Sequence, residues 1–338
     1  HPCHRAMKIL KIASSLLAGF MLAGCVATTE NKNEVTVYVS ADEQIAREVF
    51  AAFTEKTGIE VSWVGDTEAS KTTALVQRLR REKDNPLADV FWSSEILGTI
   101  RLAQDEILVP AKSEVTLSWP TQHRDASFLW FAFSPRARCI AYRPLEHEET
   151  KLPKTWWEFG AASMADPRFG TTRTHVAVMA LFPEAFTKFL KTIKGKPLLG
   201  GNAATVQQVV DGTATFAMTD SDDVHASIAR GESVAMYYPS HHDGKGGGTL
   251  LIPNTVAIIR GCAHPELAEQ FVDFMLSDEV ALLLATSTSH NIPLQRSVAE
   301  QFPELQVDNP LQVDFTKASA LEDEAIARMM KALSHESK

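Results

Sequence analysis

The chain has 338 residues, of which 45% are hydrophobic and 22% are charged, with a formal net charge of -9. This composition is typical of a globular protein with an ample core, and the length is slightly more than one core usually serves, so we expect two lobes. Only three basic and no acidic residues precede Cys25, so the rest of the chain carries 42 acidic against 30 basic residues, about -12. This excess of acid argues against a nucleic-acid partner and against adhesion to anionic lipid through protein charge.

The first 25 residues have the pattern of an export signal. Lys8 and Lys11 flank the start of an apolar run that ends at Met21 and is too short to span a bilayer. The sequence Leu22-Ala23-Gly24-Cys25 then looks like the bacterial lipobox, in which the cysteine is acylated. We therefore predict a signal peptide with a lipobox over 1–25, with Met7 as the true start of the protein. We also predict a lipid on Cys25 and a polar tether over 26–34. Such a protein works outside the cytoplasm, at the inner or the outer membrane.

Strand and helix patterns alternate after the tether. Strands are expected at 35–39, 59–64 and 88–92, and amphipathic helices at 42–57, 70–83 and 95–104. This βαβα order predicts a mostly parallel sheet covered on both faces. Further strands are expected at 128–133, 138–142, 214–218, 234–238 and 255–259, and helices near 156 and at 176–182, 222–230, 264–276, 278–285 and 321–333. No second apolar stretch is long enough to cross a membrane.

Acidic residues follow several of the predicted strands at their carboxyl ends. They are Asp42 and Glu43 after the first strand, Asp66 and Glu68 after the second, Glu95 after the third, and Asp220, Asp222 and Asp223 after the strand that ends at Met218. In open α/β sheets these ends converge on the crevice where ligands bind. Acids that meet there favour a metal ion with oxygen ligands or an ammonium group. For each acid taken alone, a helix cap or a solvated charge is the better explanation, whereas the pattern as a whole favours a ligand site.

Small polar residues precede two other predicted helices. Thr171 and Thr172 follow Gly170, and Asn202 follows two glycines. Free N–H groups at the start of a helix point outward and attract anions, so these residues are candidates for an anion site as well as for plain capping.

For the other reactive side chains, structural roles are expected. Lys71 follows a loop that only superficially resembles a phosphate-binding loop, so it is expected to be solvated or to counter Asp66 and Glu68. The pair His241-His242 lies in a glycine-rich stretch and is expected to be exposed, and Tyr237-Tyr238 is expected to pack. Cys139 and Cys262 are expected to be buried thiols in different lobes, although a disulfide is open to them outside the cell.

Several segments resemble the solute-binding proteins of ABC importers, in their ferric-iron-type branch. The likeness runs from about Val35 to Arg296. It rests on Phe53 to Ile59, Asp66 to Thr72, Ala88 to Glu95, Phe169 to Thr172, Asp220 to Asp223 and Leu251 to Ala257. The resemblance implies an α/β, two-lobed periplasmic-binding-protein fold of the class II type, with one ligand between lobes hinged by crossing strands near 128–133 and 252–256. Lobe 1 would hold 35–127 plus 255–296, and lobe 2 would hold 128–254 plus 297–338.

The resemblance also implies metal ligands. Asp42 and Glu95 stand where iron-binding members have ligands, and Asp220 and Asp222 are the acids nearest to where those members have a tyrosine pair. This chain has Thr219-Asp220-Ser221-Asp222 instead of that pair. Thr171, Thr172 and Asn202 match positions of a synergistic anion.

The sequence thus predicts a binding protein without enzyme activity or required cofactor, acting as a monomer with an ABC permease. The first hypothesis is capture of a cation, Fe(III) or another metal with its anion, by an acidic interlobe cleft. The second is a phosphorylated or amine-bearing solute in the same cleft. The third, of another class, is an exported metal-dependent hydrolase using the acidic cleft and the His241-His242 pair.

Overall fold

The structure is a computed structural model, and it describes residues 33–66, 70–193, 198–242 and 248–334. The export signal, Cys25, most of the tether and Glu68 lie outside the described residues. Among the described helices, none is long and apolar enough to cross a membrane.

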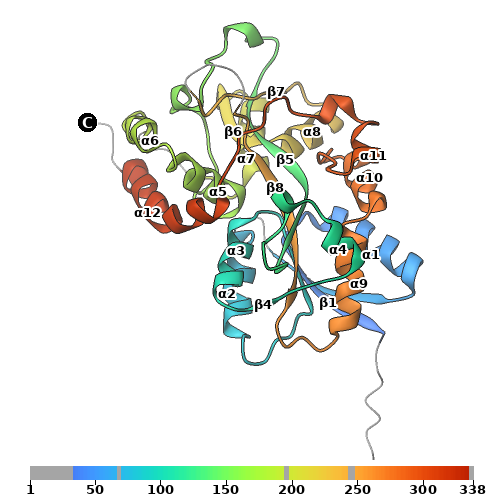
Figure 1. The fold of residues 1–338 in the computed structure, drawn as a ribbon. Coiled ribbons are helices and arrows are strands. Elements are labelled where there is room, and N and C mark those ends of the chain that lie inside the picture. The colour runs from blue at the N-terminus through green and yellow to red at the C-terminus, as the bar shows by residue number, and fades with distance from the viewer. Residues whose placement is uncertain (1–32, 67–69, 194–197, 243–247, 335–338) are drawn as a thin grey trace, which may run out of the picture. The chain divides into compact units, whose positions relative to one another are not determined.

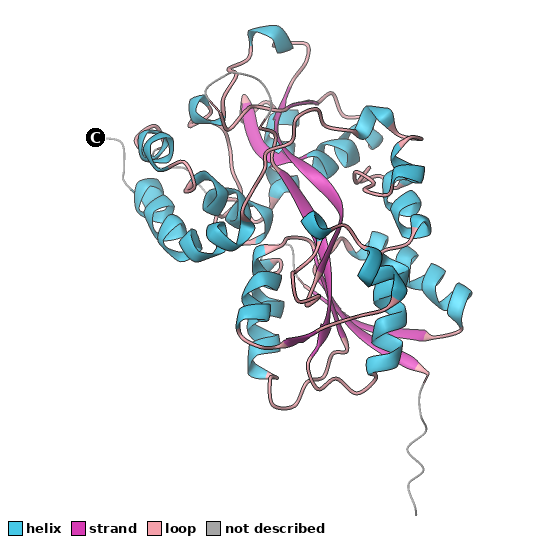
Figure 2. Cartoon of the chain, viewed as in Figure 1, coloured by secondary structure: helices cyan, strands magenta, loops and turns pink. Residues whose placement is uncertain are grey.

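Strands and helices alternate over residues 34–142, and several helices follow one another between 170 and 210 and again after 259 (Figures 1 and 2). The strands are β1 (Glu34–Val39), β2 (Glu60–Gly65), β3 (Val90–Ser93), β4 (Leu108–Val109), β5 (Phe131–Tyr142), β6 (Phe216–Asp220), β7 (Ala235–Tyr237) and β8 (Leu251–Ile259). The helices are α1 (Glu43–Thr57), α2 (Thr73–Arg81), α3 (Leu97–Gln104), α4 (Glu114–Ser118), α5 (Gly170–Met179), α6 (Pro183–Leu190), α7 (Asn202–Val210), α8 (Ser221–Ala229), α9 (Pro265–Met275), α10 (Asp278–Thr286), α11 (Arg296–Ala299) and α12 (Phe315–Ser334).

The strands join in the order β2-β1-β3-β8-β5-β6, with β4 on β8 and β7 on β5. Only the β1–β2 and β1–β3 pairs are parallel, and the other pairs are antiparallel. The expectation of a mostly parallel sheet was therefore wrong beyond β3. Parallel neighbours need a crossover connection, whereas β5 and β8 run back and forth between the two lobes.

Strands β5 and β8 connect the lower part of the molecule, which contains β1, α1, α2, α3 and α9, with the upper part, which contains β6, β7, α7 and α8 (Figure 1). The segments expected as two separate strands are one twelve-residue strand, β5, which is buried along its whole length. Its pairing with β8 shifts register between Phe133 and Arg136. Such an irregularity bends a strand, and here two arginines, Arg136 and Arg138, follow it with Ala137 between them.

Each end of this crossing has its own apolar core. Helices α1 and α9 bury Phe50, Phe53 and Phe271 against β1, β3 and β8. Beyond the register shift, Trp156, Phe186 and Phe189 pack with residues of α5, β6 and α12. Two cores connected by crossing strands are the arrangement that lets two halves move against each other about those strands.

Candidate functional site

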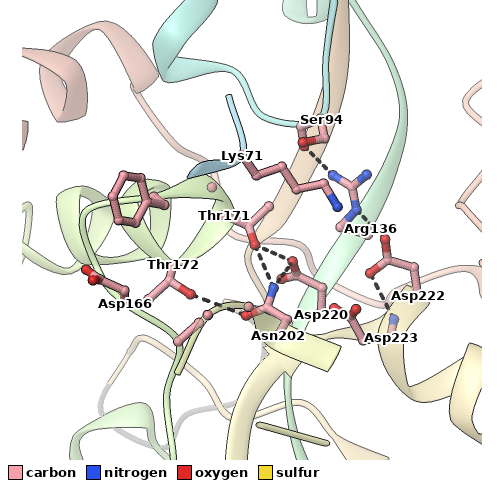
Figure 3. Close-up of a pocket in the computed structure, with 15 residues that line it drawn as sticks. Lys71, Ser94, Arg136, Asp166, Thr171, Thr172, Asn202, Asp220, Asp222 and Asp223 are labelled. Carbon is pink, nitrogen blue, oxygen red and sulfur yellow. Dashed lines mark hydrogen bonds and ion pairs between the residues drawn. The ribbon is translucent and has the colours of Figure 1, made fainter. Parts of the chain in front are cut away.

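A pocket lies where the lower part of the molecule meets the starts of α5, α7 and α8 (Figure 3). Its lining comes from Lys71 and Ser94, from Arg136 of β5, from Ala165, Asp166, Phe169, Gly170, Thr171 and Thr172, from Gly200, Gly201 and Asn202, and from Asp220, Asp222 and Asp223. A wider neighbouring pocket shares Lys71, Ser94, Arg136, Asp222 and Asp223 and adds Asp42 from the start of α1. The two pockets together form one continuous cleft, which we call the interlobe cleft.

Two helices begin at this cleft without a side-chain cap. Neither Phe169 at the start of α5 nor Gly201 at the start of α7 caps its helix through a side chain. The first N–H of α5, from Gly170, bonds the backbone carbonyl of Lys71 at 3.2 Å. This bond joins the start of α5 to the segment before α2. Two positive helix ends therefore face the same cleft, beside the ammonium group of Lys71.

Asp220 is buried and already has several partners. It accepts hydrogen bonds from Arg138 Nη1 at 3.1 Å, from Asn202 Nδ2 at 2.9 Å and from the hydroxyl of Thr171. Arg138 is itself fully buried, and its Nη2 donates to Thr172 Oγ1 at 3.1 Å. The predicted residues Thr171, Thr172, Asn202 and Asp220 thus form one hydrogen-bonded group in which Arg138 balances the charge of Asp220.

Asp222 is paired as well. Its Oδ2 accepts from Arg136 Nε at 2.8 Å, and the same guanidinium donates to the backbone carbonyl of Ser94. The hydroxyl of Thr219 donates to Asp223 Oδ2 at 3.3 Å. Carboxylate oxygens of Asp220, Asp222 and Asp223 lie within 4.8 Å of one another, which makes them a candidate metal group. The arginines beside them reduce the negative field that a metal ion would feel.

Glu95 does not share this cleft. Its carboxylate accepts from the backbone N–H groups of Leu97 at 2.6 Å and Gly98 at 2.8 Å, and from Thr174 Oγ1 at 2.8 Å. Burial, followed by the charge of Glu322, raises the pKa of Glu95 to about 7. The carboxylate therefore caps α3 and ties it to α5, and it is not part of the group that Asp220, Asp222 and Asp223 form.

The remaining predicted acids have local roles. Glu43 is exposed and pairs with Arg47 at 2.7 Å, Asp66 accepts from Ser70 at 3.0 Å, and neither of them lines the cleft. Asp42 caps α1, where its Oδ1 accepts from Gln44 N at 3.0 Å and from Ile45 N at 3.5 Å.

Replacing Asp42 with alanine is expected to lower the free energy of unfolding by about 1 kcal/mol, because the first turn of α1 loses its cap. Asn caps a helix about as well as Asp, so Asp42→Asn is the matched control and should unfold like the wild type. Urea denaturation followed by circular dichroism measures both. Equal stability of the alanine variant and the wild type would contradict a capping role.

Sequence reasoning missed the basic residues of the site. Lys71, expected to be solvated or to counter nearby acids, was not named as a ligand residue, and it lines both parts of the cleft. Arg136 and Arg138 were not singled out, although a charged residue in an apolar strand signals a buried partner. His241, expected to be exposed, is only 1% exposed. Its ring packs against Trp156 and Phe182, which shield it from solvent.

The tyrosines and cysteines have places outside the cleft. All four tyrosines of the chain are described, and none lines either pocket. Tyr237 and Tyr238 line a separate groove. Cys139 and Cys262 are free thiols, the first buried and the second partly buried.

Comparison with known proteins shows which family this chain belongs to. The family model of bacterial extracellular solute-binding proteins matches residues 39–282. The chain belongs to this family. Membership confirms the predictions of a binding protein rather than an enzyme and of a place outside the cytoplasm.

Among curated relatives, Iron uptake protein A1 of Synechocystis is 27% identical over 83% of this chain and 82% of its own length. The Major ferric iron-binding protein of Neisseria meningitidis is 26% identical over 86% and 89%. A putative 2-aminoethylphosphonate-binding periplasmic protein of Salmonella typhimurium is 24% identical over 86% and 87%. The solved ferric binding protein of Campylobacter jejuni is 22% identical, with a TM-score of 0.77 over 88% of this chain and 99% of that one. These likenesses confirm the predicted two-lobed fold and the resemblance to the ferric-iron-type branch.

Proposed function

We propose that the protein is the ligand-capturing component of an ABC importer and that its interlobe cleft takes a small organic solute with a phosphate or phosphonate group and an amine. The observation that carries this proposal is the meeting of two uncapped helix starts, those of α5 and α7, beside Lys71. The lobes would close on the solute and present it to a membrane permease.

The anionic end of the solute would face the starts of α5 and α7. Backbone N–H groups at helix starts bind phosphate-like groups well, and Gly200 and Gly201 let a ligand approach the backbone closely. Lys71 comes from the other side of the cleft, so an anion that bonds both Lys71 and α7 favours the closed arrangement.

The cationic end would face Asp222 and Asp223. A single ammonium charge suits carboxylates that already have basic neighbours, because it needs less negative field than a trivalent ion. One relative's printed name, 2-aminoethylphosphonate-binding, describes a solute of this kind.

Calorimetry tests this proposal with 2-aminoethylphosphonate, inorganic phosphate and Fe(III) citrate as probes. We expect 2-aminoethylphosphonate to bind and to raise the melting temperature, and Lys71→Met to weaken that binding about tenfold or more through the loss of a charged hydrogen bond. Lys83→Met is the matched control, since Lys83 is exposed and contacts the carbonyl of Asp105. Failure of the wild type to bind either phosphorus compound would overturn the proposal.

The second candidate is Fe(III) or another metal with its synergistic anion. The cluster of Asp220, Asp222 and Asp223 and the printed names of the iron-binding relatives favour it. Asp42 lines the wider part of the cleft and would complete the set on closure, while the predicted ligand Glu95 stays outside it. Under this candidate, Fe(III) citrate binds the wild type and Asp222→Asn abolishes that binding.

The predicted organisation accompanies either candidate. We propose a lipid anchor on Cys25, a monomeric state and the lobe boundaries given above, in which β5 and β8 form the hinge. Cys25→Ala releasing the protein from membranes into the soluble fraction would support the anchor, and unchanged membrane association would contradict it.

A further inference from the structure

A chain of buried hydrogen bonds runs from the backbone of Gly248 to the wall of the ligand pocket. His241 Nδ1 lies 2.8 Å from the carbonyl oxygen of Gly248, and His241 Nε2 lies 2.9 Å from His175 Nε2. Arg138 Nε then donates to His175 Nδ1 at 3.2 Å. His175 and His241 are each 1% exposed, and Arg138 is 0% exposed.

The partners at the two ends of this chain fix both tautomers. A carbonyl oxygen only accepts, so His241 must donate from Nδ1 and, when neutral, accept at Nε2. His175 must then donate from its Nε2, which leaves its Nδ1 as the acceptor that Arg138 Nε requires. Each ring therefore has one tautomer that satisfies the chain, and the opposite tautomer of His175 would leave Arg138 Nε without an acceptor.

Both rings are held neutral by their surroundings. Trp156 packs edge-on against His175 with ring centroids 4.4 Å apart, and Phe182 stacks on His241 at 6.1 Å. Burial lowers the pKa of both imidazoles, and Arg138 lowers them further. A neutral ring is what the chain needs, because a protonated His175 has no lone pair to accept from Arg138.

Arg138 connects the two histidines to residues that line the pocket. Its Nη1 lies 3.3 Å from Asn202 Oδ1 and 3.1 Å from Asp220 Oδ1, and its Nη2 donates to Thr172. Asn202 and Thr172 line the pocket at the starts of α7 and α5, whereas Arg138 and the two histidines do not line it.

We propose that His175 and His241 are positioning residues that lock the guanidinium of Arg138, and through it set Asn202 and Thr172 for the anionic end of the solute. This rests on the proposed function for the nature of the ligand, but the hydrogen-bond chain itself is independent of it. Without the acceptor at His175, Arg138 Nε is left buried and unpaired, which costs free energy. Turning the guanidinium toward another acceptor would break its bonds to Asn202 and Thr172, which line the pocket.

Two nearly isosteric substitutions separate positioning from packing. His175→Asn offers an oxygen where Nδ1 accepts from Arg138, and His175→Leu has the same shape without an acceptor. We expect the affinity for 2-aminoethylphosphonate to fall about tenfold or more in the leucine variant and to stay within about threefold of wild type in the asparagine variant. Equal losses in the two variants would indicate packing alone and would overturn the proposal, as would wild-type affinity in the leucine variant.

A nuclear magnetic resonance readout works without any ligand. The ring nitrogens should show His241 protonated at Nδ1 and His175 protonated at Nε2. The Arg138 Nε–H resonance should stay in the hydrogen-bonded range in His175→Asn and move upfield in His175→Leu. The opposite tautomers would overturn the proposal. If the wild type binds neither phosphorus compound while these signatures hold, the proposed ligand is wrong and the positioning of Arg138 stands.

Discussion

Replacing Asp220 with alanine is expected to lower the free energy of unfolding by about 3 to 5 kcal/mol. The carboxylate is 2% exposed and is the charged partner of Arg138, which has no contact with water. Removing one member of a buried ion pair leaves the other charge uncompensated, and the neighbours Asn202 and Thr171 also lose their acceptor. Urea denaturation measures the loss.

Two further variants serve as controls for this prediction. Glu43→Ala removes an exposed pair with Arg47 and should change stability by less than about 1 kcal/mol. The double variant Asp220→Ala with Arg138→Met removes both charges and should be less destabilised than the sum of the single variants. An Asp220→Ala protein as stable as Glu43→Ala would show that Arg138 does not depend on this carboxylate.

Acidification is expected to destabilise the protein through His241. Burial, with the charges of His242 and Arg138, lowers the pKa of His241 from 6.5 to about 4, and His175 faces the same ring. Between pH 6.5 and about 4, His241 is therefore protonated in the unfolded chain and neutral in the folded chain. This contribution to stability is complete above pH 6.5 and is lost as the pH falls toward 4, by about 2 kcal/mol between pH 7.5 and pH 5.

The variant His241→Asn isolates this contribution. Asparagine keeps a donor for Gly248 and has no ring to protonate, so its stability difference from wild type should shrink by about 2 kcal/mol between pH 7.5 and pH 5. Glu95, whose raised pKa acts in the opposite direction in this range, is present in both proteins and cancels. A difference that stays constant over this pH range would mean that His241 titrates normally.

The family and the main elements could be predicted from the sequence because they depend on local patterns. Ile45, Val49 and Phe53 share one helical face and form the buried face of α1, and Gly58 ends the helix in the left-handed conformation, with φ 71°. The anion-site candidates Thr171, Thr172 and Asn202 were also found from their places before helices, and all three line the pocket.

The partners of the acids could not be predicted in this way. Asp42, Glu95 and Asp220 look alike in the sequence, as acids that follow strands. In the structure the first caps α1, the second is buried under α3 with Thr174, and the third is bonded to Arg138. Each difference arises from a residue that is distant in the chain or from the local path of the backbone after the strand.

By itself, the sequence determined the alternation of strands and helices over residues 34–142 and the apolar faces, because hydrophobic periodicity and turn residues act over short distances. Only the tertiary structure decided the charge of the cleft. The antiparallel pairing of β5 with β6 sets Arg138 opposite Asp220, 82 residues away, and Arg136 bonds Asp222, 86 residues away. This pairing replaces a row of free acids with balanced, hydrogen-bonded groups. Because a buried charge needs a partner, that long-range pairing fixes which ligand charges the cleft can accept.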